Sequence, residues 1–298
     1  MRIGYPCVNV MLGCRSNRHF RLTSYSERRV VDTVRENLDC LLEILRFNAD
    51  HDIRFFRISS DLVPFASHSV CQFDWVSRFR REMEKVGEAV DAYNMRISMH
   101  PGQFAVLNSP DGGVLDSTMR ELLYHSRLLA AMGLDPSAKI QVHVGGVYGD
   151  KEKSLLRFIE RYRRLPAELR QRLVLENDDR SYTVRDCLRV HGHTGVPVLL
   201  DALHHELNGS GDTLVEAVAL CAATWRQVDG PLMLDYSQRA GSGRRGGHAS
   251  TVDVDRFERF LESTLPFDFD LMLEIKDKEQ SVLKVGPIVA RDPRFQRA

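Results

Sequence analysis

The sequence predicts a single α/β domain over residues 1–298, folded as a (β/α)8 TIM barrel, and three observations support this fold class. Short apolar runs alternate with longer amphipathic segments, as expected when strands are buried on both faces and helices on one. The length of 298 residues fits one barrel of about 250 residues with insertions. Nearly every expected strand from the third onward ends in a side chain that can bind a metal.

The expected strands are short runs rich in aliphatic and β-branched residues. They cover residues 2–7, 53–58, 95–99, 139–144, 172–175, 196–200, 232–234 and 269–273. An open doubly wound sheet would show the same alternation. It would also place a glycine-rich phosphate turn after the first strand, and the residues Pro6-Cys7-Val8-Asn9 do not form such a turn. The closed barrel is therefore favoured.

The expected helices are amphipathic and should cover the outside of the barrel. The first has apolar residues at helical spacing, namely Val31, Val34, Leu38, Leu41, Leu42 and Leu45. Comparable apolar stripes run through residues 73–92, 119–132, 155–162, 214–223 and 257–261. One glycine-rich insertion with three arginines, residues 238–250, interrupts the alternation.

Composition excludes several classes of protein. The 41 basic and 41 acidic residues balance, so any nucleic-acid surface must be local. The chain has no apolar run of about 18 residues and no signal-peptide pattern, which predicts a cytoplasmic protein without a membrane contact. The six cysteines form no CxxC pair, so we expect reduced, buried thiols instead of a disulfide framework or a cysteine zinc knuckle.

The candidate metal ligands stand where the expected strands end. In chain order they are His100, His143, Glu176, Asp201, His204, Asp235 and Glu274, followed by His248 in the glycine-rich insertion. A single histidine there is commonly hydrogen-bonded structure, and a single aspartate commonly caps the next helix. The carboxyl ends of barrel strands converge on the face that carries active sites, so the set as a whole predicts a metal centre.

The types of candidate ligand indicate which metal ions the centre could bind and which reaction it could catalyse. Asp201 and His204 are spaced to lie on one side of a helical turn. A set of histidines and carboxylates without thiolates suits Mn²⁺, Zn²⁺ or Fe²⁺. Eight ligands are too many for one ion, so two or three ions bridged by a carboxylate such as Glu176 are expected. Such a cluster suits hydrolysis of a phosphate ester.

Basic residues are expected around the same face. Those in the loops after the first, seventh and eighth strands are Arg15, Arg18, Arg21, Arg239, Arg244, Arg245, Lys276 and Lys278. A phosphate backbone could lie along them, and a solvated charged rim is the alternative.

Several segments resemble the UV damage endonuclease family. They are residues 4–9 (GYPCVN), 57–61 (RISSD), 99–104 (MHPGQF), 142–146 (VHVGG), 175–179 (LENDD) and 201–205 (DALHH). The likeness runs from the first strand to Glu274. This family is related in fold to endonuclease IV and xylose isomerase.

The resemblance implies a DNA repair enzyme with a metal cluster, Mn²⁺ being expected and Zn²⁺ the alternative. It would nick UV-damaged double-stranded DNA immediately 5′ to a pyrimidine dimer or (6-4) photoproduct, leaving a 3′-hydroxyl and a 5′-phosphate. No obligate protein partner is expected.

The resemblance also implies roles for individual residues. His100, His143 and Glu176 would hold the first ion, and Glu176 would bridge to a second. The second ion would also take Asp201, Asp235 and Glu274, and His204 and His248 would serve a third. Glu176, His143 and His68 would be catalytic, His68 near the scissile phosphate, although a surface loop histidine is the alternative there.

Four further residues match family positions that contact DNA. Gln103 and Phe104 match the pair that enters the duplex beside flipped-out damaged nucleotides. Tyr5 and Asn9 match positions that line the lesion pocket. Packing roles are the alternatives for Phe104 and Tyr5.

Two departures from the family pattern stand out. Met233 and Asp235 occupy the positions of a lysine, carboxylated in some members, and a histidine. We therefore expect no modified lysine and a shift toward harder ions such as Mn²⁺. Phe104 stands where the family often has tyrosine.

Three other classes remain open. An apurinic-site endonuclease of the endonuclease IV type would use a similar metal set. A sugar isomerase would use the same barrel but gives no reason for a basic rim or for Gln103 and Phe104. A DNA-binding module without catalysis leaves the converging ligands unexplained.

Overall fold

The computed structural model is a closed barrel of eight parallel strands and describes residues 1–241 and 246–295. The strands are β1 (Ile3–Pro6), β2 (Phe55–Ile58), β3 (Arg96–Met99), β4 (Lys139–His143), β5 (Leu173–Glu176), β6 (Val198–Asp201), β7 (Met233–Tyr236) and β8 (Asp270–Leu273). Each strand pairs with the next in the chain, and β1 pairs with β8 to close the sheet. The predicted TIM barrel is confirmed, with each strand within a few residues of its expected place.

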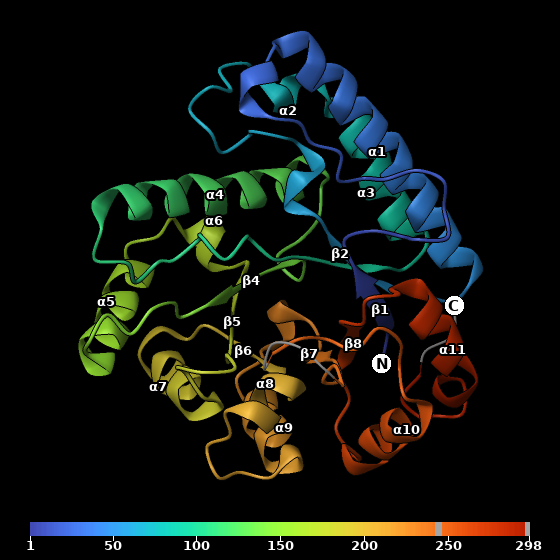
Figure 1. Cartoon of the computed structure of the whole chain (residues 1–298), viewed down its shortest axis with the longest axis vertical. Helices are drawn as coiled ribbons and strands as arrows, with labels where there is room; N and C mark the ends of the chain where they lie inside the picture. The colour runs from blue at the N-terminus through green and yellow to red at the C-terminus, as the bar shows by residue number, and fades with distance from the viewer. Residues whose placement is uncertain (242–245, 296–298) are drawn as a thin grey trace.

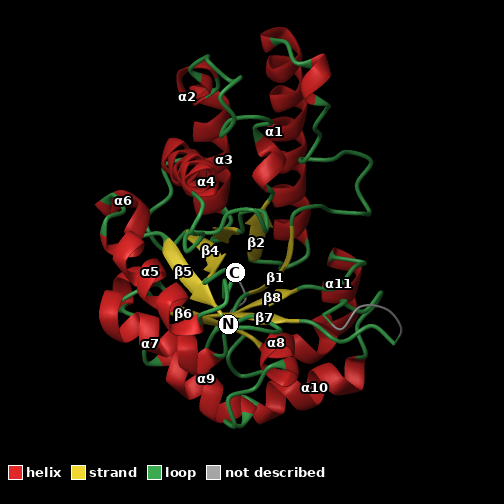
Figure 2. Cartoon of the chain, turned by 60° about the vertical axis from the view of Figure 1, so that its left-hand side comes forward, coloured by secondary structure: helices red, strands yellow, loops and turns green. Residues whose placement is uncertain are grey.

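Helices surround the strands (Figures 1 and 2). They are α1 (Glu27–Asp50), α2 (Trp75–Arg78), α3 (Arg80–Ala92), α4 (Gly112–Ala131), α5 (Lys151–Arg163), α6 (Ala167–Arg170), α7 (Val184–Thr194), α8 (Ala202–Leu207), α9 (Leu214–Ala222), α10 (Val254–Ser263) and α11 (Glu279–Val289). The long helix α1 lies against α3, and both stand at the top of Figure 1. No helix in the described ranges has the length and hydropathy needed to cross a membrane.

Two of the longer helices, α7 and α11, were not predicted. Helix α7 buries few apolar side chains, so its sequence shows no clear apolar stripe. Its bounds are set by a Thr183–Asp186 capping box at the start and by Gly195, in the left-handed conformation, at the end. Helix α11 contains Pro287, a residue that usually argues against a helix interior. In both cases the apolar stripe is too short to dominate the local pattern.

The barrel interior is layered, and the layers place the functional side chains. One apolar cluster is formed by Phe55, Val174, Leu199, Met233 and Met272, which come from five different strands. Side chains of a strand alternate between faces, so the residues two positions further along share the same inward direction. Those residues are Arg57, Glu176, Asp201, Asp235 and Glu274. A layer of charged groups therefore lies directly on an apolar layer, toward the carboxyl ends of the strands.

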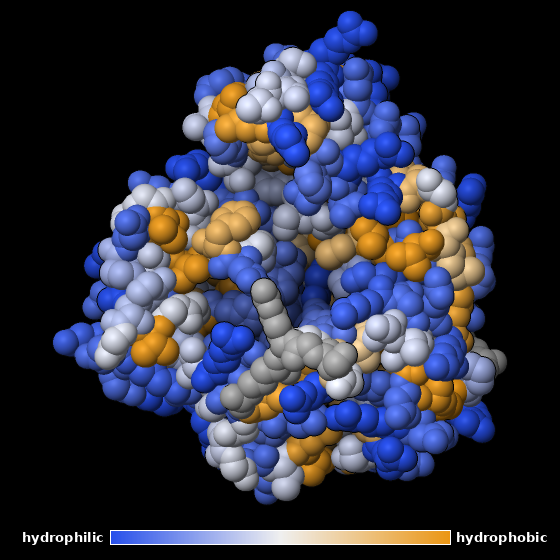
Figure 3. All heavy atoms as spheres, viewed as in Figure 1, coloured by the Kyte–Doolittle hydropathy of each residue, from blue (hydrophilic) through white to orange (hydrophobic). Residues whose placement is uncertain are grey.

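The amino-terminal end of the barrel is closed by buried ion pairs. Arg96 Nη1 lies 2.9 Å from Asp270 Oδ2, and Lys139 Nζ lies 2.6 Å from Asp229 Oδ1. These pairs leave the carboxyl-terminal face as the open end. Figure 3 shows a hollow with hydrophilic residues near the middle of the face turned to the viewer.

The expectation about cysteines was wrong for one pair. Cys14 and Cys40 form a disulfide, with their Cα atoms 5.7 Å apart. The loop after β1 folds back against α1, so two residues 26 positions apart become neighbours, which a search for close cysteine spacing does not detect. Cys187 and Cys221 are buried free thiols, as expected, whereas Cys7 and Cys71 are partly exposed.

Candidate metal centre

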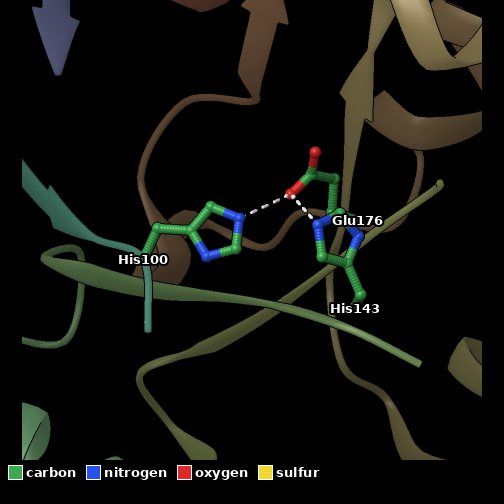
Figure 4. A group of neighbouring side chains, drawn as sticks. All are labelled: His100, His143 and Glu176. Carbon is green, nitrogen blue, oxygen red and sulfur yellow. Dashed lines mark ion pairs between the residues drawn. The ribbon is translucent and has the colours of Figure 1, made fainter. Parts of the chain in front are cut away.

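Three strands bring two imidazoles against one carboxylate. His100 follows β3, His143 ends β4 and Glu176 ends β5. His100 Nε2 lies 3.3 Å and His143 Nε2 lies 3.5 Å from the same oxygen, Glu176 Oε2 (Figure 4). Glu176 is only 2% exposed, so its charge is held away from water. A buried carboxylate facing two imidazole nitrogens is a suitable ligand set for a divalent cation.

The other oxygen of Glu176 faces the start of α8. His204 Nδ1 lies 3.3 Å from Glu176 Oε1 and 3.6 Å from Asp201 Oδ2. Asp201 ends β6 and caps α8, because its Oδ1 accepts a hydrogen bond of 2.7 Å from the backbone N–H of His204. This cap holds the start of α8 against the end of β6, so Asp201 and His204 both lie beside Glu176.

Burial and mutual charge shift the titration of these groups. Burial opposes the charged form of His204, but Asp201 and Glu176 outweigh it and raise the pKa of His204 to about 11. Burial raises the pKa of Asp201 to about 7, with His204 opposing the shift. The pKa of His143 is lowered by burial, which favours the neutral imidazole that can bind a metal.

The donor atoms fit divalent ions. In His100–His143–Glu176 and in Glu176–Asp201–His204, one atom per residue lies within 4.8 Å of the others, and Glu176 is common to both groups. Asp201 Oδ2 is buried and has no hydrogen-bond partner within the described residues. A buried oxygen without a donor is costly, and a cation between these groups would satisfy it.

A third group, Asp201–Asp235–Glu274, meets the same 4.8 Å criterion but has a different environment. Arg57 Nη2 donates to Asp235 Oδ1 and Oδ2 at 2.9 Å and 2.8 Å, and Arg57 Nη1 donates to Glu274 Oε1. Gln141 Nε2 donates to Asp235 Oδ2 at 2.6 Å and to Glu176 Oε2 at 2.5 Å. Burial opposes the charged form of Glu274, yet Arg57 lowers the pKa of that carboxyl to about 2.

The candidate ligands that lie together in the structure differ in part from the sets that the resemblance assigns to each ion. His204 lies with Glu176 and Asp201, two residues that the resemblance assigns to the second ion, and not with His248. His248 Nδ1 lies 3.7 Å from Glu274 Oε2 and belongs to none of the three-residue ligand groups in the described part of the chain. His68 is exposed, lies in the loop after β2 and accepts a hydrogen bond from the backbone N–H of Val70. It is outside these groups as well.

The mouth of the barrel is a pocket of about 340 Å³ directly above these residues. Its lining includes Arg57, His100, Gln103, His248, Glu274, Lys276 and Lys278. Gln103 is exposed, and Phe104 is 61% exposed. The ring of Phe104 packs over Gly102, where a Cβ atom would come within 2.5 Å of it. The two residues matched to the inserting pair thus lie at the rim of the mouth.

Tyr5 and Asn9, the residues matched to the lesion pocket, are buried in this structure. Tyr5 is 0% exposed and Asn9 is 3% exposed. The Tyr5 hydroxyl donates to Asn48 Oδ1 at 2.7 Å and accepts from Asn9 Nδ2 at 2.8 Å. In this structure the pair is part of the packing between β1 and α1.

The basic rim is present in part. Arg15 and Arg18 line a pocket of about 360 Å³ with Arg29 and His19, next to α1. Arg21, Arg239 and Lys276 are exposed. Arg244 and Arg245 lie outside the described residues.

Two residues of the centre were not assigned a role from sequence. Arg57 was noted only as part of a motif, and Gln141 was not singled out. The usable signal was strand periodicity, since Arg57 follows the inward Phe55 by two positions and Gln141 precedes the inward His143 by two.

Comparison with known proteins identifies the family of this barrel. The model of the family UV-endonuclease UvdE matches residues 1–290. The chain belongs to this family. This UvdE-family chain is 34% identical over 286 residues to a UV DNA damage endonuclease of Clostridium perfringens, covering 95% of the chain and 69% of the relative. The alignment accords with the resemblance noted from the motifs.

Solved structures agree with this assignment. The crystal structure of SacUVDE is 42% identical, with a TM-score of 0.93 over 97% of this UvdE-family chain and 98% of the other. Endonuclease IV from Thermus thermophilus is 16% identical, with a TM-score of 0.59 over 84% of this chain and 94% of the other. At that identity the second likeness concerns the fold alone.

Proposed function

We propose that this UV-damage repair endonuclease nicks the DNA strand immediately 5′ to cyclobutane pyrimidine dimers and (6-4) photoproducts. The products would be a 3′-hydroxyl and a 5′-phosphate on the lesion side. The observation that carries the proposal is the position of Glu176, which faces His100, His143 and His204 beneath a mouth whose rim presents Gln103 and Phe104.

The ligand groups support a cofactor of divalent ions, for which we propose Mn²⁺. His100, His143 and Glu176 would hold one ion, and Glu176, Asp201 and His204 another. Ions bound there would supply Lewis-acid activation of water and of the phosphate ester. The choice of Mn²⁺ follows the family resemblance, because the two groups together offer three imidazoles and two carboxylates, a mixed set that also suits Zn²⁺.

The protein's own residues would position the DNA. Lys276 and Lys278 line the mouth, and Arg15 and Arg18 line a second pocket next to α1, so phosphates could be held at both places. Gln103 and Phe104 would enter the duplex at the lesion. Insertion costs unstacking energy, which is smallest where damage has already weakened pairing, so the pair could select lesions without contacting a particular sequence.

The test is a nicking assay on a labelled duplex with one cyclobutane dimer, beside an abasic duplex and an undamaged duplex. The protein is treated with a chelator and then supplied with Mn²⁺. We expect a single cut just 5′ to the dimer that requires Mn²⁺. Cutting at the abasic site alone would move the chain to the activity of the endonuclease IV class, and no cutting on any duplex would contradict the proposal.

A further inference from the structure

The carboxylates of Asp235 and Glu274 already have a cation between them. Arg57 is 2% exposed, and its guanidinium donates to both oxygens of Asp235 and to Oε1 of Glu274. Gln141 Oε1 accepts a further hydrogen bond of 2.7 Å from Arg57 Nη2, and its Nε2 donates to Asp235. Asp235 therefore receives N–H donors on both oxygens from residues of two other strands, β2 and β4.

A guanidinium and a divalent ion would compete for these oxygens. Arginine keeps its charge at any pH that proteins tolerate, so Arg57 cannot leave as a neutral group. A divalent ion placed among Asp201, Asp235 and Glu274 would stand close to that fixed positive charge in a buried site, where repulsion is weakly screened. It would also have to share oxygens that already accept hydrogen bonds from Arg57 and Gln141.

Met233, two positions before Asp235 on β7, offers no ligand atom for a third ion. Met233 is 0% exposed and packs with Phe55, Val174, Leu199 and Met272. Its thioether cannot be carboxylated, and its neighbours in that cluster are apolar. The position that is lysine in the family pattern thus adds packing and no ligand.

We infer that Arg57 is the permanent cation of the Asp235–Glu274 pair and that the centre holds two divalent ions instead of three. The two ions share Glu176, one with His100 and His143 and the other with Asp201 and His204. The inference rests on the proposed function, because it assumes that the centre binds divalent ions at all.

Metal stoichiometry tests the inference independently of activity. The full chain is equilibrated with Mn²⁺, and bound metal is counted by native mass spectrometry and elemental analysis. We expect two Mn²⁺ per chain and an electron paramagnetic resonance spectrum of a coupled pair. Three Mn²⁺ per chain would overturn the inference while leaving the endonuclease proposal standing, and no bound Mn²⁺ would overturn both.

Two variants test which carboxylates contribute to the number of bound Mn²⁺ ions. Asp235→Asn keeps the side-chain shape and leaves Arg57 paired with Glu274, so we expect it to retain two Mn²⁺. Glu176→Gln is the matched control, since it removes the shared ligand and should lower the count. Loss of one Mn²⁺ in Asp235→Asn, with its melting temperature unchanged, would make Asp235 a ligand and contradict the inference.

A second observation concerns the turn after β1. Val10 and Met11 are 47% and 54% exposed, although both are apolar. Their backbone is held firmly, because Glu279 Oε1 accepts from Val10 N at 2.8 Å and from Met11 N at 2.7 Å. Asn9 Oδ1 also accepts from Met11 N and from Leu12 N, both at 2.9 Å.

This apolar tip, Val10 and Met11, lies beside the mouth of the barrel. Glu279, which holds it, is buried and directly follows Lys278, and Lys278 lines the mouth together with Gln103. The tip belongs to the loop after β1, and Phe104 belongs to the loop after β3. A rigid backbone that presents apolar side chains next to lysines suits contact with unstacked bases flanked by phosphates.

We propose that Met11, supported by Val10, is a second apolar contact with damaged duplex DNA, on the β1 side of the mouth. The proposal rests on the proposed substrate. It also gives Asn9 and Glu279 a positioning role, which accounts for the burial of two polar residues next to an exposed turn.

Binding measurements test the tip with a matched control. Met11→Ser and Val228→Ser each remove an exposed apolar side chain, but Val228 precedes β7 and so lies at the opposite end of the barrel. We expect Met11→Ser to weaken binding to a duplex with one cyclobutane dimer about tenfold, as loss of a base contact does. Binding to undamaged duplex and the Mn²⁺ count should not change.

The control decides the outcome. If Met11→Ser and Val228→Ser bind the damaged duplex equally well, the tip makes no specific contact and the proposal is wrong. If the wild type itself does not distinguish damaged from undamaged duplex, the proposed function fails instead.

Discussion

His204 Nδ1 lies 3.3 Å from Glu176 Oε1, while the imidazoles of His100 and His143 both face Glu176 Oε2. One carboxylate therefore links two groups of candidate ligands that come from four consecutive strands and the start of α8. Its burial means that little water is available to stabilise its charge. Because both ligand groups share Glu176, its loss should weaken metal binding more than the loss of any other single ligand.

Glu176→Gln should abolish nicking and leave DNA binding largely intact. The amide keeps the size of the side chain but removes the charge shared by both ligand groups, and metal-assisted catalysis depends on several kcal/mol of charge stabilisation. We expect kcat/KM on a dimer-containing duplex to fall by at least about 10³-fold. Affinity for the same duplex, measured by fluorescence anisotropy with Mn²⁺ present, should change by only a few fold. Full nicking by this variant would remove the metal-centre model.

Gln103→Ala combined with Phe104→Ala should remove damage preference before metal binding. Both side chains are exposed at the rim and belong to none of the ligand groups among the described residues, so the centre itself is left in place. The ratio of nicking rates on damaged and undamaged duplex should fall toward one, since the preference depends on unstacking a weakened step. An unchanged ratio, with unchanged Mn²⁺ stoichiometry, would show that lesions are selected elsewhere.

The fold and the ligand positions could be predicted because they follow from short-range rules. The strands of the barrel are parallel, so β3 to β8 end on one face. Side-chain alternation predicts which residues point inward there, and the two rules bring together His100, His143, Glu176, Asp201, Asp235 and Glu274. The grouping could not be predicted, because it depends on side-chain directions. His204 turns toward Glu176 since its own backbone N–H is fixed by Asp201.

The buried charges and the disulfide escaped prediction for a related reason. Arg57 pairs with Asp235, which is 178 positions away, and no local pattern marks one as the partner of the other. Cys14 and Cys40 meet only because the loop after β1 returns to α1. The burial of Tyr5 and Asn9 depends on the contact of Tyr5 with Asn48 of α1, which a match to family positions does not reveal.

Arg15→Ala combined with Arg18→Ala should weaken DNA binding without regard to damage. Both residues follow β1 and line the pocket next to α1, so their expected contacts are with phosphates. Phosphate contacts release counterions, and the slope of log K against log salt should become shallower by about 2 units for two lost contacts. The affinity is measured on damaged and undamaged duplex across a salt series. A loss confined to the damaged duplex would contradict a backbone contact.

His125 should make the protein less stable as the pH falls below neutrality. It is fully buried in α4, with Nδ1 2.7 Å from the backbone oxygen of Glu121 and Nε2 2.9 Å from the Ser60 hydroxyl. Burial lowers its pKa from 6.5 to about 4. The neutral ring is therefore favoured in the folded state more than in the unfolded state. Its contribution is complete above pH 6.5 and is lost as the pH falls from there toward 4.

The linkage relation puts the loss at about 2 kcal/mol between pH 7 and pH 5. Urea unfolding at several pH values measures it, and His125→Gln, which cannot titrate, serves as the control. The free energy of unfolding of the wild type should fall more steeply over this range than that of the variant by about this amount. Parallel curves for the two proteins would show that the pKa of His125 is the same in the folded and unfolded states, and would contradict the prediction.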